Sequence, residues 1–587
     1  MILTPGALAS IILIGRSREE NLESFLAWVW LHLLLVIEAV LVIIGADISF
    51  RHPDFGSNRF SRLEASLGRF ARNRAASIAA VIGVALLLRC VIAPFTPIPE
   101  PGIHDEFSNL LAADTFAHGR LTNPTHPLWV HFESFQIEHQ PSYASMYPPG
   151  QGLVLAMGER IGSPIFGVWI IAALMCGAIC WMLQGWLPSG WALLGAGIAV
   201  IRLATFNYWS NGYMVGALPA AGGALVLGSL PRILRRQRPH DAIFLAVGIA
   251  ILVNTRPYEG AVLSVAAIVI IGYHLVRSRA EISIGIRRVV LPLVFVLVPT
   301  IAVMAYYNWR VFGSPFTLPY QINRATYAMA GVFLWDAPRP APVYNHKAMA
   351  DYYTGWELGA VKKARTPRGF LELTLWKVTT AWQFYLGPAL TLPLLVVPLI
   401  LRDRRIRPLL WIAAVFALAL FVQTWFMPHY AAPLAAAIIA ISIQSLRHVR
   451  AWCWRGKPVG LALVRMVPAV CMLMLGLRLV IGIVHPPVHL GTPNTWATIW
   501  TVPLGRQKLI SELESRPGLH LVMVRYGPRH DPFREYVYND ANIDASRIVW
   551  ARDMGTEGNR ALLEYFRNRQ IWMLDADTEP LRLVRVN

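Results

Sequence analysis

Long apolar runs separated by short basic loops dominate this chain. A helix needs roughly 20 apolar residues to cross a bilayer, and about 17 can suffice. Twelve stretches meet that requirement, and residues 1–14 would add a thirteenth span if they also cross. The pattern predicts an all-α polytopic membrane bundle of about 12–13 transmembrane helices. The expected spans are 26–48, 75–95, 164–184, 191–206, 213–230, 242–256, 259–276, 289–308, 383–401, 409–427, 430–446 and 461–484.

Five loops between these spans are rich in arginine. The first carries six arginines, and each of the others carries four basic residues. Threading the spans in order places all five loops on one side, which the positive-inside rule assigns to the cytoplasm. We therefore expect a multi-pass membrane protein whose long loops and C-terminus lie on the outer face. The loops are 51–74, 231–240, 277–288, 402–407 and 447–457.

Composition agrees with the membrane interpretation. The 587 residues are 55% hydrophobic and only 15% charged, with a mean hydropathy of +0.46. The net charge of +19 comes mainly from the short loops, so we expect no nucleic-acid partner. Five cysteines form no CxxC pair, and none lies in a long loop expected outside, so neither a zinc site nor a disulfide framework is expected.

Three long segments then lie on the outer face: 96–163, 309–382 and the tail from 486. The tail alternates short helical stretches with β-rich runs, which predicts a small α/β domain with a parallel sheet. No glycine-rich phosphate loop follows its strands, so we interpret it as a packing or docking module. The expected domains are 1–74, an N-terminal membrane segment with a basic loop; 75–485, the catalytic membrane domain; and 486–587, the outer α/β domain. Within the tail, helices are expected at 511–515 and 558–567, and strands at 520–526, 547–551 and 570–574.

The first outer loop holds an acidic pair, Asp105 and Glu106, about ten residues beyond the 75–95 span. Carboxylates close to the membrane surface can act as a general base and as an orienting or cation-binding group. An alternative is that both acids only cap a helix starting near Phe107. The histidines of this loop lack zinc-site spacing, while a divalent metal held by Asp105 and Glu106 stays open.

The order of features in this loop resembles the GT-C superfamily of membrane glycosyltransferases. An acidic pair follows an early span, and a helix and an extended stretch then lead to Tyr147-Pro148-Pro149 before the next span. The superfamily includes protein O-mannosyltransferases and lipid A aminoarabinose transferases, which use polyprenyl-phosphate sugars on the periplasmic or lumenal side. The tract 119–127 also resembles a bacterial subset described only as glycosyltransferase-like. The resemblance covers about 75–480 in topology and leaves the 26–48 span and the tail unexplained.

This resemblance implies roles for particular residues. The essential carboxylate of the family corresponds to Asp105, with Glu106 beside it. A second loop acid contributes in some members, and Glu133, with Glu138 behind it, is our choice. The Pro-Pro pair implies a short helix at the membrane surface, matching 150–161.

A lipid phosphate also needs cations at the outer ends of spans. Arg89, Arg202 and Arg256 have that position in our threading, and Arg256 lies in a Pro-broken turn beside Tyr258. Arginine can grip a phosphate through two parallel hydrogen bonds, although each side chain could equally extend to the membrane surface. Glu38, inside the first span, predicts a partner on another helix.

Two further places are weaker candidates. Family members often carry Arg-Tyr followed by a proline at an outward turn, where this chain has His429-Tyr430. Histidine in place of arginine removes a permanent charge, although a neutral histidine can still donate one hydrogen bond to a phosphate. The alternative is that the pair belongs to the aromatic belt at the membrane interface. In the second outer loop, Arg324 and Lys347 are weak candidates for holding the acceptor or a phosphate.

These features favour a glycosyltransferase that moves a sugar from a polyprenyl-phosphate donor to a lipid, glycan or protein acceptor, with membrane lipids as further partners. The main alternative is a polytopic transporter or flippase without transferase activity. A polysaccharide polymerase or ligase is a third interpretation. Clustering of Asp105, the Pro148-Pro149 helix and Arg256 around one outward cavity would favour sugar transfer.

Overall fold

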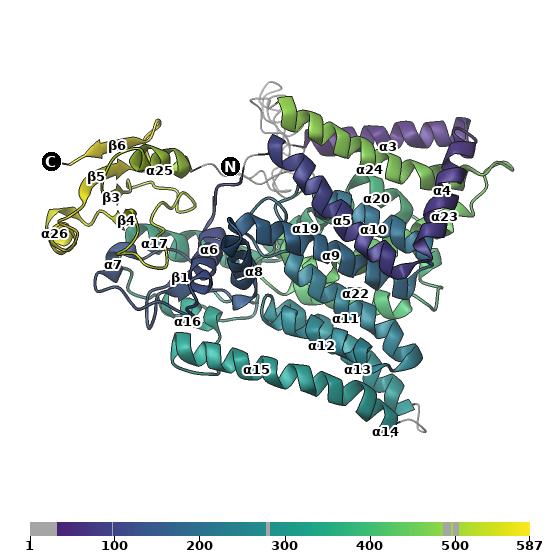
Figure 1. Cartoon of the computed structure of the whole chain (residues 1–587), viewed down its shortest axis with the longest axis horizontal. Coiled ribbons are helices and arrows are strands. Elements are labelled where there is room, and N and C mark those ends of the chain that lie inside the picture. Colours follow the sequence, from purple (N-terminus) through teal and green to yellow (C-terminus); the bar gives the residue numbers. More distant parts are fainter. Residues whose placement is uncertain (1–31, 97, 278–281, 485–494, 497–503, 587) are drawn as a thin grey trace.

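The computed structural model describes residues 32–96, 98–277, 282–484, 495–496 and 504–586. Its main part is a bundle of long apolar helices, and eight of the described helices are long and apolar enough to cross a membrane (Figure 1). They comprise α3 (Leu33–Arg51), α5 with η1 (Arg74–Phe95), α9 (Pro164–Trp186), α11 (Ala217–Arg236), α13 (Pro257–Arg277), α14 to α15 (Ser283–Phe312), η6 with α23 (Pro428–Arg450) and α24 (Val459–Val484).

Three further apolar helices are shorter: α10 (Ser189–Leu203), α12 (Pro239–Val253) and α22 (Arg407–Phe421). The expected span 383–401 is broken into the π-helical turn η5 (Trp382–Leu386), α20 (Gly387–Leu394) and α21 (Val397–Ile400). Gly387 has a φ of 54°, and Pro393 lies inside α20, so a single straight helix cannot form here. The stretch 1–14 lies outside the described residues. Otherwise the predicted helical membrane bundle is confirmed.

Small residues bring the central helices close together. Helices α9, α11 and α23 are largely buried, whereas α15 is almost entirely exposed and packs mainly on α12. A Cβ on Gly223 of α11 would lie 1.9 Å from the Pro433 carbonyl, so only glycine permits this contact. It seats the turn η6 (Pro428–Leu434) against the middle of the bundle.

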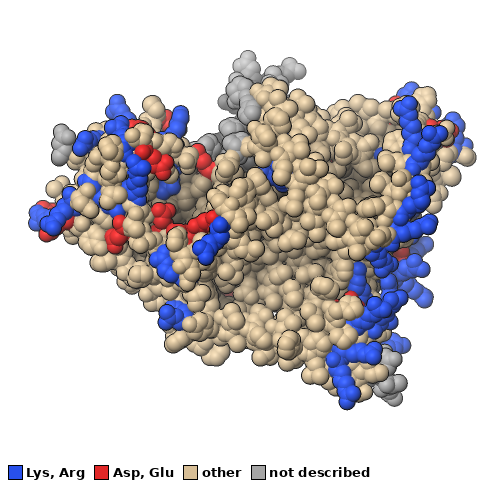
Figure 2. Space-filling view, in the orientation of Figure 1, with Lys and Arg blue, Asp and Glu red and all other residues tan. Residues whose placement is uncertain are grey.

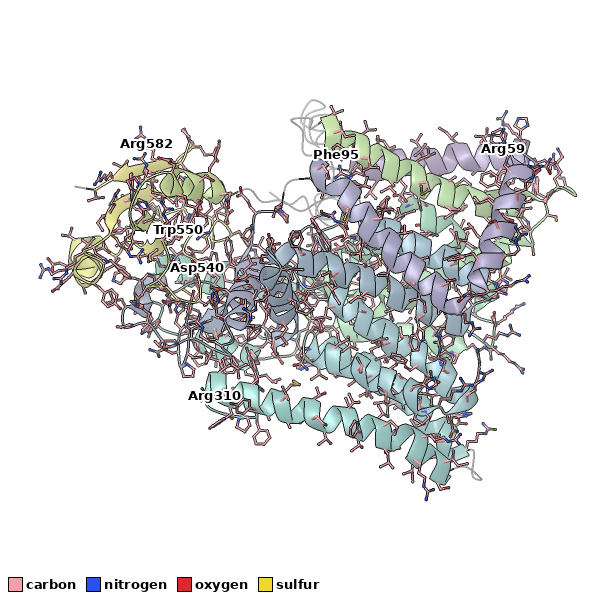
Figure 3. All side chains as sticks on the ribbon, in the orientation of Figure 1. Arg59, Phe95, Arg310, Asp540, Trp550 and Arg582 are labelled. Carbon is pink, nitrogen blue, oxygen red and sulfur yellow. The ribbon has the colours of Figure 1, made fainter. Side chains whose placement is uncertain are left out.

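The two ends of the bundle differ in charge. Lys and Arg side chains gather along one end, where Figure 3 places Arg59 on α4 (Ser57–Ala71) (Figure 2, Figure 3). We call this the basic end. The first and second loops and the C-terminal domain lie at the opposite end, which we call the loop end and where Asp540 and Trp550 are found (Figure 3).

The loop end is built from short elements. The first loop contains α6 (His104–Ala117), α7 (Trp129–Phe132), the two-stranded ribbon β1 (Ile137–Glu138) and β2 (Ala144–Ser145), and α8 (Pro149–Arg160). The helix after the Pro-Pro pair is therefore confirmed. The second loop contains α16 (Pro319–Thr326), α17 (Lys347–Ala350), η4 (Asp351–Glu357), α18 (Leu358–Ala364) and α19 (Pro367–Ala381).

The C-terminal domain is a small α/β unit, as the sequence predicts. Its sheet has the order β4-β3-β5-β6, and β3 pairs in parallel with both neighbours. The antiparallel edge strand β6 was not predicted. Apolar residues of this domain share one hydrophobic core with the first loop, including Phe107 and Leu111 of α6. Its elements are α25 (Arg506–Glu514), β3 (His520–Arg525), β4 (Ile548–Arg552), α26 (Gly555–Tyr565), β5 (Gln570–Asp575) and β6 (Arg582–Arg585).

Candidate functional site

Asp105 lies in the first turn of α6 and is partly exposed. The hydroxyl of Tyr147 donates a hydrogen bond to its Oδ1, and the same hydroxyl is 2.7 Å from Oε1 of Gln136. Burial, and then the neighbouring Asp105 charge, raise the pKa of the Tyr147 phenol well above its usual value. Tyr147 therefore keeps its proton and holds one carboxylate oxygen of Asp105 in a defined place.

Glu106 has a different environment. Its carboxylate is buried and accepts hydrogen bonds from the backbone N–H groups of Gly102 and Tyr213, each at 2.9 Å. Burial raises the pKa of this carboxyl to about 7, although the two hydrogen bonds act in the opposite direction. Glu106 lies in the acidic first turn of α6, and its contact with Tyr213 also reaches beyond the helix. It joins α6 to the loop 204–216 and so positions Asp105.

Arg256 occupies the turn between α12 and α13. The N–H of Gly150, at the start of α8, donates to the Asn254 carbonyl over 2.9 Å. A Cβ on Gly150 would lie 2.5 Å from that oxygen, so glycine is required for this contact. The helix that begins at Pro149, directly after Tyr147 and Pro148, therefore docks on the turn that carries Arg256. This contact connects the first loop to the membrane bundle.

The guanidinium of Arg256 lies 3.9 Å from the centre of the Tyr430 ring, in cation–π contact. Its strongest charge neighbour is Glu259, which is buried and accepts a hydrogen bond from Gln423 at 3.2 Å. Among the described residues, no backbone carbonyl accepts a hydrogen bond from this guanidinium. Arg256 is thus packed on an aromatic ring and attracted by the charge of Glu259, with part of its donor capacity unused.

Tyr320 of α16 completes the group. Its ring packs edge-on against Tyr147, with ring centres 5.6 Å apart. Burial raises the pKa of its phenol, while the charge of Arg256 acts to lower it and that of Asp105 to raise it. Both charges therefore reach Tyr320. Its hydroxyl is buried and has no hydrogen-bond partner among the described residues, which is costly unless an acceptor fills the site.

A narrow crevice opens beside this group, between α8, α12 and the exposed helix α15. It is mostly apolar, and Tyr320 forms one part of its wall. Val253 and Pro257 bring the crevice next to Arg256, which lies between them in the chain. Its lining includes Pro148, Pro149, Val253, Pro257, Met304 and Tyr320.

The other two predicted phosphate-binding arginines have partners inside the protein. Arg89 donates from Nη1 to the Thr205 carbonyl and to Asn211, both at 2.7 Å. Arg202 bonds to Glu38 at 3.1 Å and to the Leu386 carbonyl at 2.7 Å. The Nε atoms of Arg89, Arg202 and Arg256 all lack a partner within the described chain, so the difference lies in the terminal nitrogens. Glu38 has the helix partner that the sequence predicts.

His429 and Tyr258 are also engaged internally. The Nδ1 of His429 lies 3.0 Å from the Tyr208 hydroxyl, which also accepts from the His429 backbone N–H at 3.1 Å. The Tyr258 hydroxyl donates to the Ala419 carbonyl over 3.0 Å. Of the residues in these two turns, Tyr430 is therefore the one that contacts Arg256.

Glu133 joins the two loops. Its carboxylate accepts hydrogen bonds from Tyr327 at 2.9 Å and Asn345 at 3.0 Å. Burial raises the pKa of Glu133, and both hydrogen bonds oppose that shift. Glu138 is also buried, but its Oε1 has no partner among the described residues, and burial raises its pKa to about 8. Neither acid is shown to contact Asp105.

The two weak candidates of the second loop form ion pairs at the loop end. Arg324 pairs with Glu357 and also donates to the Ala330 carbonyl. Lys347 is exposed and pairs with Asp351 four residues later. Both pairings satisfy the cation locally, so neither side chain joins the Asp105–Arg256 group.

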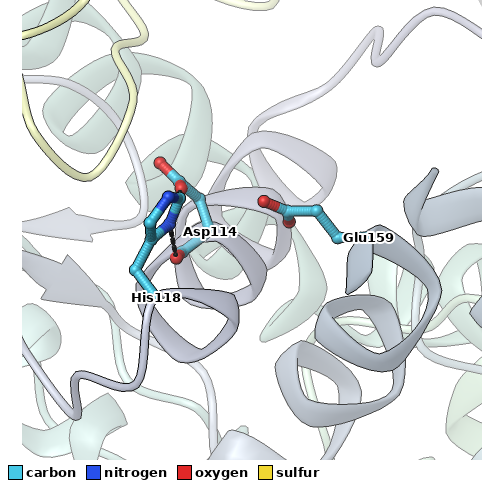
Figure 4. Close-up of side chains that lie close together, drawn as sticks. All are labelled: Asp114, His118 and Glu159. Atoms are coloured by element: carbon cyan, nitrogen blue, oxygen red, sulfur yellow. Dashed lines mark hydrogen bonds and ion pairs between the residues drawn. The ribbon is translucent and has the colours of Figure 1, made fainter. Parts of the chain in front are cut away.

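In the described structure, one group of side chains with metal-binding atoms lies apart from Asp105 and Glu106. Asp114, His118 and Glu159 offer three ligand atoms within 4.8 Å of one another (Figure 4). Asp114, however, contacts Nδ1 of His118 at 2.8 Å and accepts from the Ala541 N–H at 2.6 Å. These contacts attach α6 to the C-terminal domain. Both Glu106 oxygens accept from backbone amides, so a divalent metal shared by Asp105 and Glu106 would compete with those hydrogen bonds.

No protein-family model and no curated protein matches the chain. Several solved structures resemble it in fold. One is ArnT from Cupriavidus metallidurans bound to undecaprenyl phosphate, with 14% identity over 85% of this chain and 93% of that one, at a TM-score of 0.46. Another is the Archaeoglobus fulgidus oligosaccharyltransferase tethered with an acceptor peptide, with 12% identity over 85% and 69% of the chains, at a TM-score of 0.41.

Both are GT-C glycosyltransferases. At these identities the likeness concerns the fold, and the argument for function rests on the geometry of the loop end.

The sequence interpretation missed three members of the group. The sequence singled out Tyr147 only as the neighbour of the Pro-Pro pair, and it singled out neither Tyr320 nor Glu259. Tyr320 is 173 residues from Tyr147 in the numbering, so their contact depends on tertiary folding. Tyr147 precedes a proline, Tyr320 follows one, and Glu259 lies one helical turn after Arg256. These positions were the signals in the sequence that could have identified them.

Proposed function

We propose that this chain is a membrane glycosyltransferase that moves a sugar from a polyprenyl-phosphate donor to an acceptor hydroxyl at the loop end. The observation that carries the proposal is the buried, unpartnered Tyr320 hydroxyl beside Arg256, in the wall of an apolar crevice. Hydrogen-bond donors suit a phosphate, and the apolar side chains beside them suit contact with the first part of its lipid chain. Asp105, held by Tyr147, borders the same group.

Each residue has a chemical role in this proposal. The acceptor oxygen attacks the anomeric carbon while the bond from that carbon to the phosphate oxygen breaks. Asp105 takes the proton of the acceptor hydroxyl as general base. Arg256 and Tyr320 stabilise the negative charge that develops on the departing lipid phosphate. Tyr147 and Glu106 are positioning residues, since one holds the carboxylate and the other holds α6.

The same arrangement supports transfer over transport. A transporter concentrates its polar site near the middle of the membrane, within discontinuous helices. Here Asp105, the helix after Pro148-Pro149 and Arg256 meet at the loop end, beside a crevice that opens toward α15. The proposal therefore keeps the donor and the acceptor on one side of the membrane.

Asp105→Asn tests the base directly. Membranes containing the variant would receive polyprenyl-phosphate sugars, and transfer of label to product would be followed. Loss of a general base lowers turnover by about 10²- to 10⁴-fold. Asp114→Asn on the same helix is the matched control and should retain activity, because its amide oxygen can still accept from Ala541. Unchanged turnover in Asp105→Asn would remove the proposed base.

The sidedness has its own test. We propose that the basic end is cytoplasmic and the loop end periplasmic, in a bacterial inner membrane. Cys90 and Cys453 are the exposed cysteines of the described chain, so both tests use a Cys90→Ser background. Cys453 lies at the basic end, and an impermeant maleimide should label it only in inverted vesicles. A Cys453→Ser/Ser515→Cys variant places the thiol in the C-terminal domain and should reverse that result. The opposite labelling pattern would contradict the orientation.

A further inference from the structure

A polar cavity lies at the basic end, far from the group around Asp105 and from the apolar crevice beside it. Its volume is about 440 Å³, and three arginines line it: Arg405, Arg447 and Arg450. The only carboxylate in its lining is Asp403. These residues come from the segment between α21 and α22 and from the last turn of α23. The proposed sugar transfer uses none of them.

Hydrogen bonds organise this cavity and occupy its acid. Asp403 accepts from the Gln444 side chain at 2.6 Å and from the Arg405 backbone N–H at 3.0 Å. Gln444 in turn accepts from Nη1 of Arg447 at 2.7 Å. The imidazole of His448 lies 3.9 Å from Asp403. The acid therefore orders the wall. Arg450 pairs with Glu64 at 3.5 Å, so Arg405 and Arg447 supply the remaining positive charge.

The cavity lies at the level where lipid headgroups are expected. Helix α4 is amphipathic and contacts α10 at this end, and its apolar residues Leu63, Leu67 and Phe70 are exposed. A basic helix with an exposed apolar face lies in the interface plane of a membrane. Glu64 on the same helix lies 3.5 Å from Arg450, which sets the cavity beside that plane.

We propose that this cavity binds the phosphate headgroup of an anionic lipid from the adjacent leaflet. Basic pockets between transmembrane helices suit such headgroups. A lipid fits better than a soluble phosphate because apolar side chains border the site. Leu399 and Leu401, just before Asp403 in the chain, are 51% and 56% exposed. Trp191 forms part of the wall, with Arg450 5.8 Å from its ring centre, and suits the interfacial glycerol region.

The binding test uses the full-length protein in detergent, titrated with short-chain phosphatidylglycerol or phosphatidylcholine and followed by native mass spectrometry. We expect the wild type to retain phosphatidylglycerol selectively. Arg405→Gln/Arg447→Gln should weaken its affinity about 10- to 30-fold, since each surface cation contributes on the order of 1 kcal/mol toward an anionic lipid. Arg405→Lys/Arg447→Lys should retain most of the affinity, which separates lost charge from misfolding.

Arg402→Gln/Arg404→Gln is the matched control. It removes the same charge from the same segment, and both side chains are exposed and outside the cavity lining. Equal weakening by the control would overturn the proposal in favour of diffuse attraction to the basic end. Equal retention of the two lipids, or binding of glycerol phosphate as tight as that of phosphatidylglycerol, would also overturn it.

Discussion

Two buried arginines, Arg202 and Arg256, have similar surroundings in the bundle but different roles. Both lie near an acid and over an aromatic ring, at 4.5 Å from Trp496 and 3.9 Å from Tyr430 respectively. The terminal nitrogens of Arg202 bond to Glu38 and to a backbone carbonyl. Arg256 has no comparable carbonyl partner in the described structure.

The groups around the two arginines differ in the same way. Glu38 accepts from Arg202, from the Ala389 N–H at 3.1 Å and from the Trp496 indole at 3.0 Å. Such a network stabilises helix packing, and of the Arg202 nitrogens only Nε lacks a partner among the described residues. Around Arg256, by contrast, the Tyr320 hydroxyl remains unpartnered. A saturated cluster therefore indicates structure, and an unsaturated one beside a crevice indicates binding.

The largest expected effect concerns stability. Arg202→Gln leaves Glu38 buried without its cation, which costs about 3–5 kcal/mol for a buried ion pair. The variant should show a much lower thermal unfolding midpoint in detergent, measured by fluorescence of the purified chain. The double variant Arg202→Gln/Glu38→Gln is the control and should recover part of the loss. A midpoint unchanged in Arg202→Gln would erase the distinction between the two arginines.

Arg256→Gln should have the opposite profile. We expect sugar transfer to fall about 100-fold, as on removal of one donor to a developing negative charge. The unfolding midpoint should fall less than in Arg202→Gln, because Glu259 keeps its hydrogen bond from Gln423. Arg256→Lys keeps the charge but loses the planar fork and should fall between the two. Turnover is measured with polyprenyl-phosphate sugar in membranes. If Arg256→Gln instead unfolds the protein and Arg202→Gln abolishes transfer, the assignment is reversed.

Glu138 extends the comparison of partnered and unpartnered buried groups to the pH dependence of stability. Its folded-state pKa of about 8 lies above the ordinary value for glutamate, so the folded state binds the proton more tightly than the unfolded state. Stability should therefore fall as the pH rises from about 4.5 to 8. Glu138→Gln should remove that slope, stabilising the chain at pH 7 by up to about 3 kcal/mol and leaving it unchanged at pH 4. The partnered Glu133→Gln is the comparison, and thermal midpoints across this pH range provide the measurement.

Tyr320→Phe should have the smallest effect. Deleting a buried hydroxyl that bonds to no described residue should leave the unfolding midpoint unchanged or raise it. Loss of one hydrogen bond to the departing phosphate should lower turnover about tenfold. Tyr344→Phe in the same loop is the control, because its hydroxyl donates to the Tyr327 carbonyl at 2.7 Å, and its loss should affect stability more than turnover. Full activity in Tyr320→Phe would remove the phenol from the proposed phosphate site.

The local pattern of residues was sufficient to predict the membrane bundle, the grouping of basic loops at one end and the α/β tail. Each follows from hydropathy over about 20 residues or from alternation within a strand, which depend only on neighbours in the chain. The acidic pair after the second span and the helix after Pro148-Pro149 were visible for the same reason. The break in the 383–401 stretch was missed because its apolar residues outweigh Gly387 and Pro393 in any hydropathy window.

Tertiary structure decided which polar groups are already satisfied. Nothing local distinguishes Arg89, Arg202 and Arg256, since each follows an apolar run near the end of a helix. Whether their nitrogens meet a carbonyl depends on segments far away in the chain, such as Leu386, which is 184 residues from Arg202. Hydrogen bonds act over about 3 Å, whereas hydropathy acts over a whole helix. The chain's own pattern therefore determined where the helices lie, and folding alone decided which of their charges remain for a ligand.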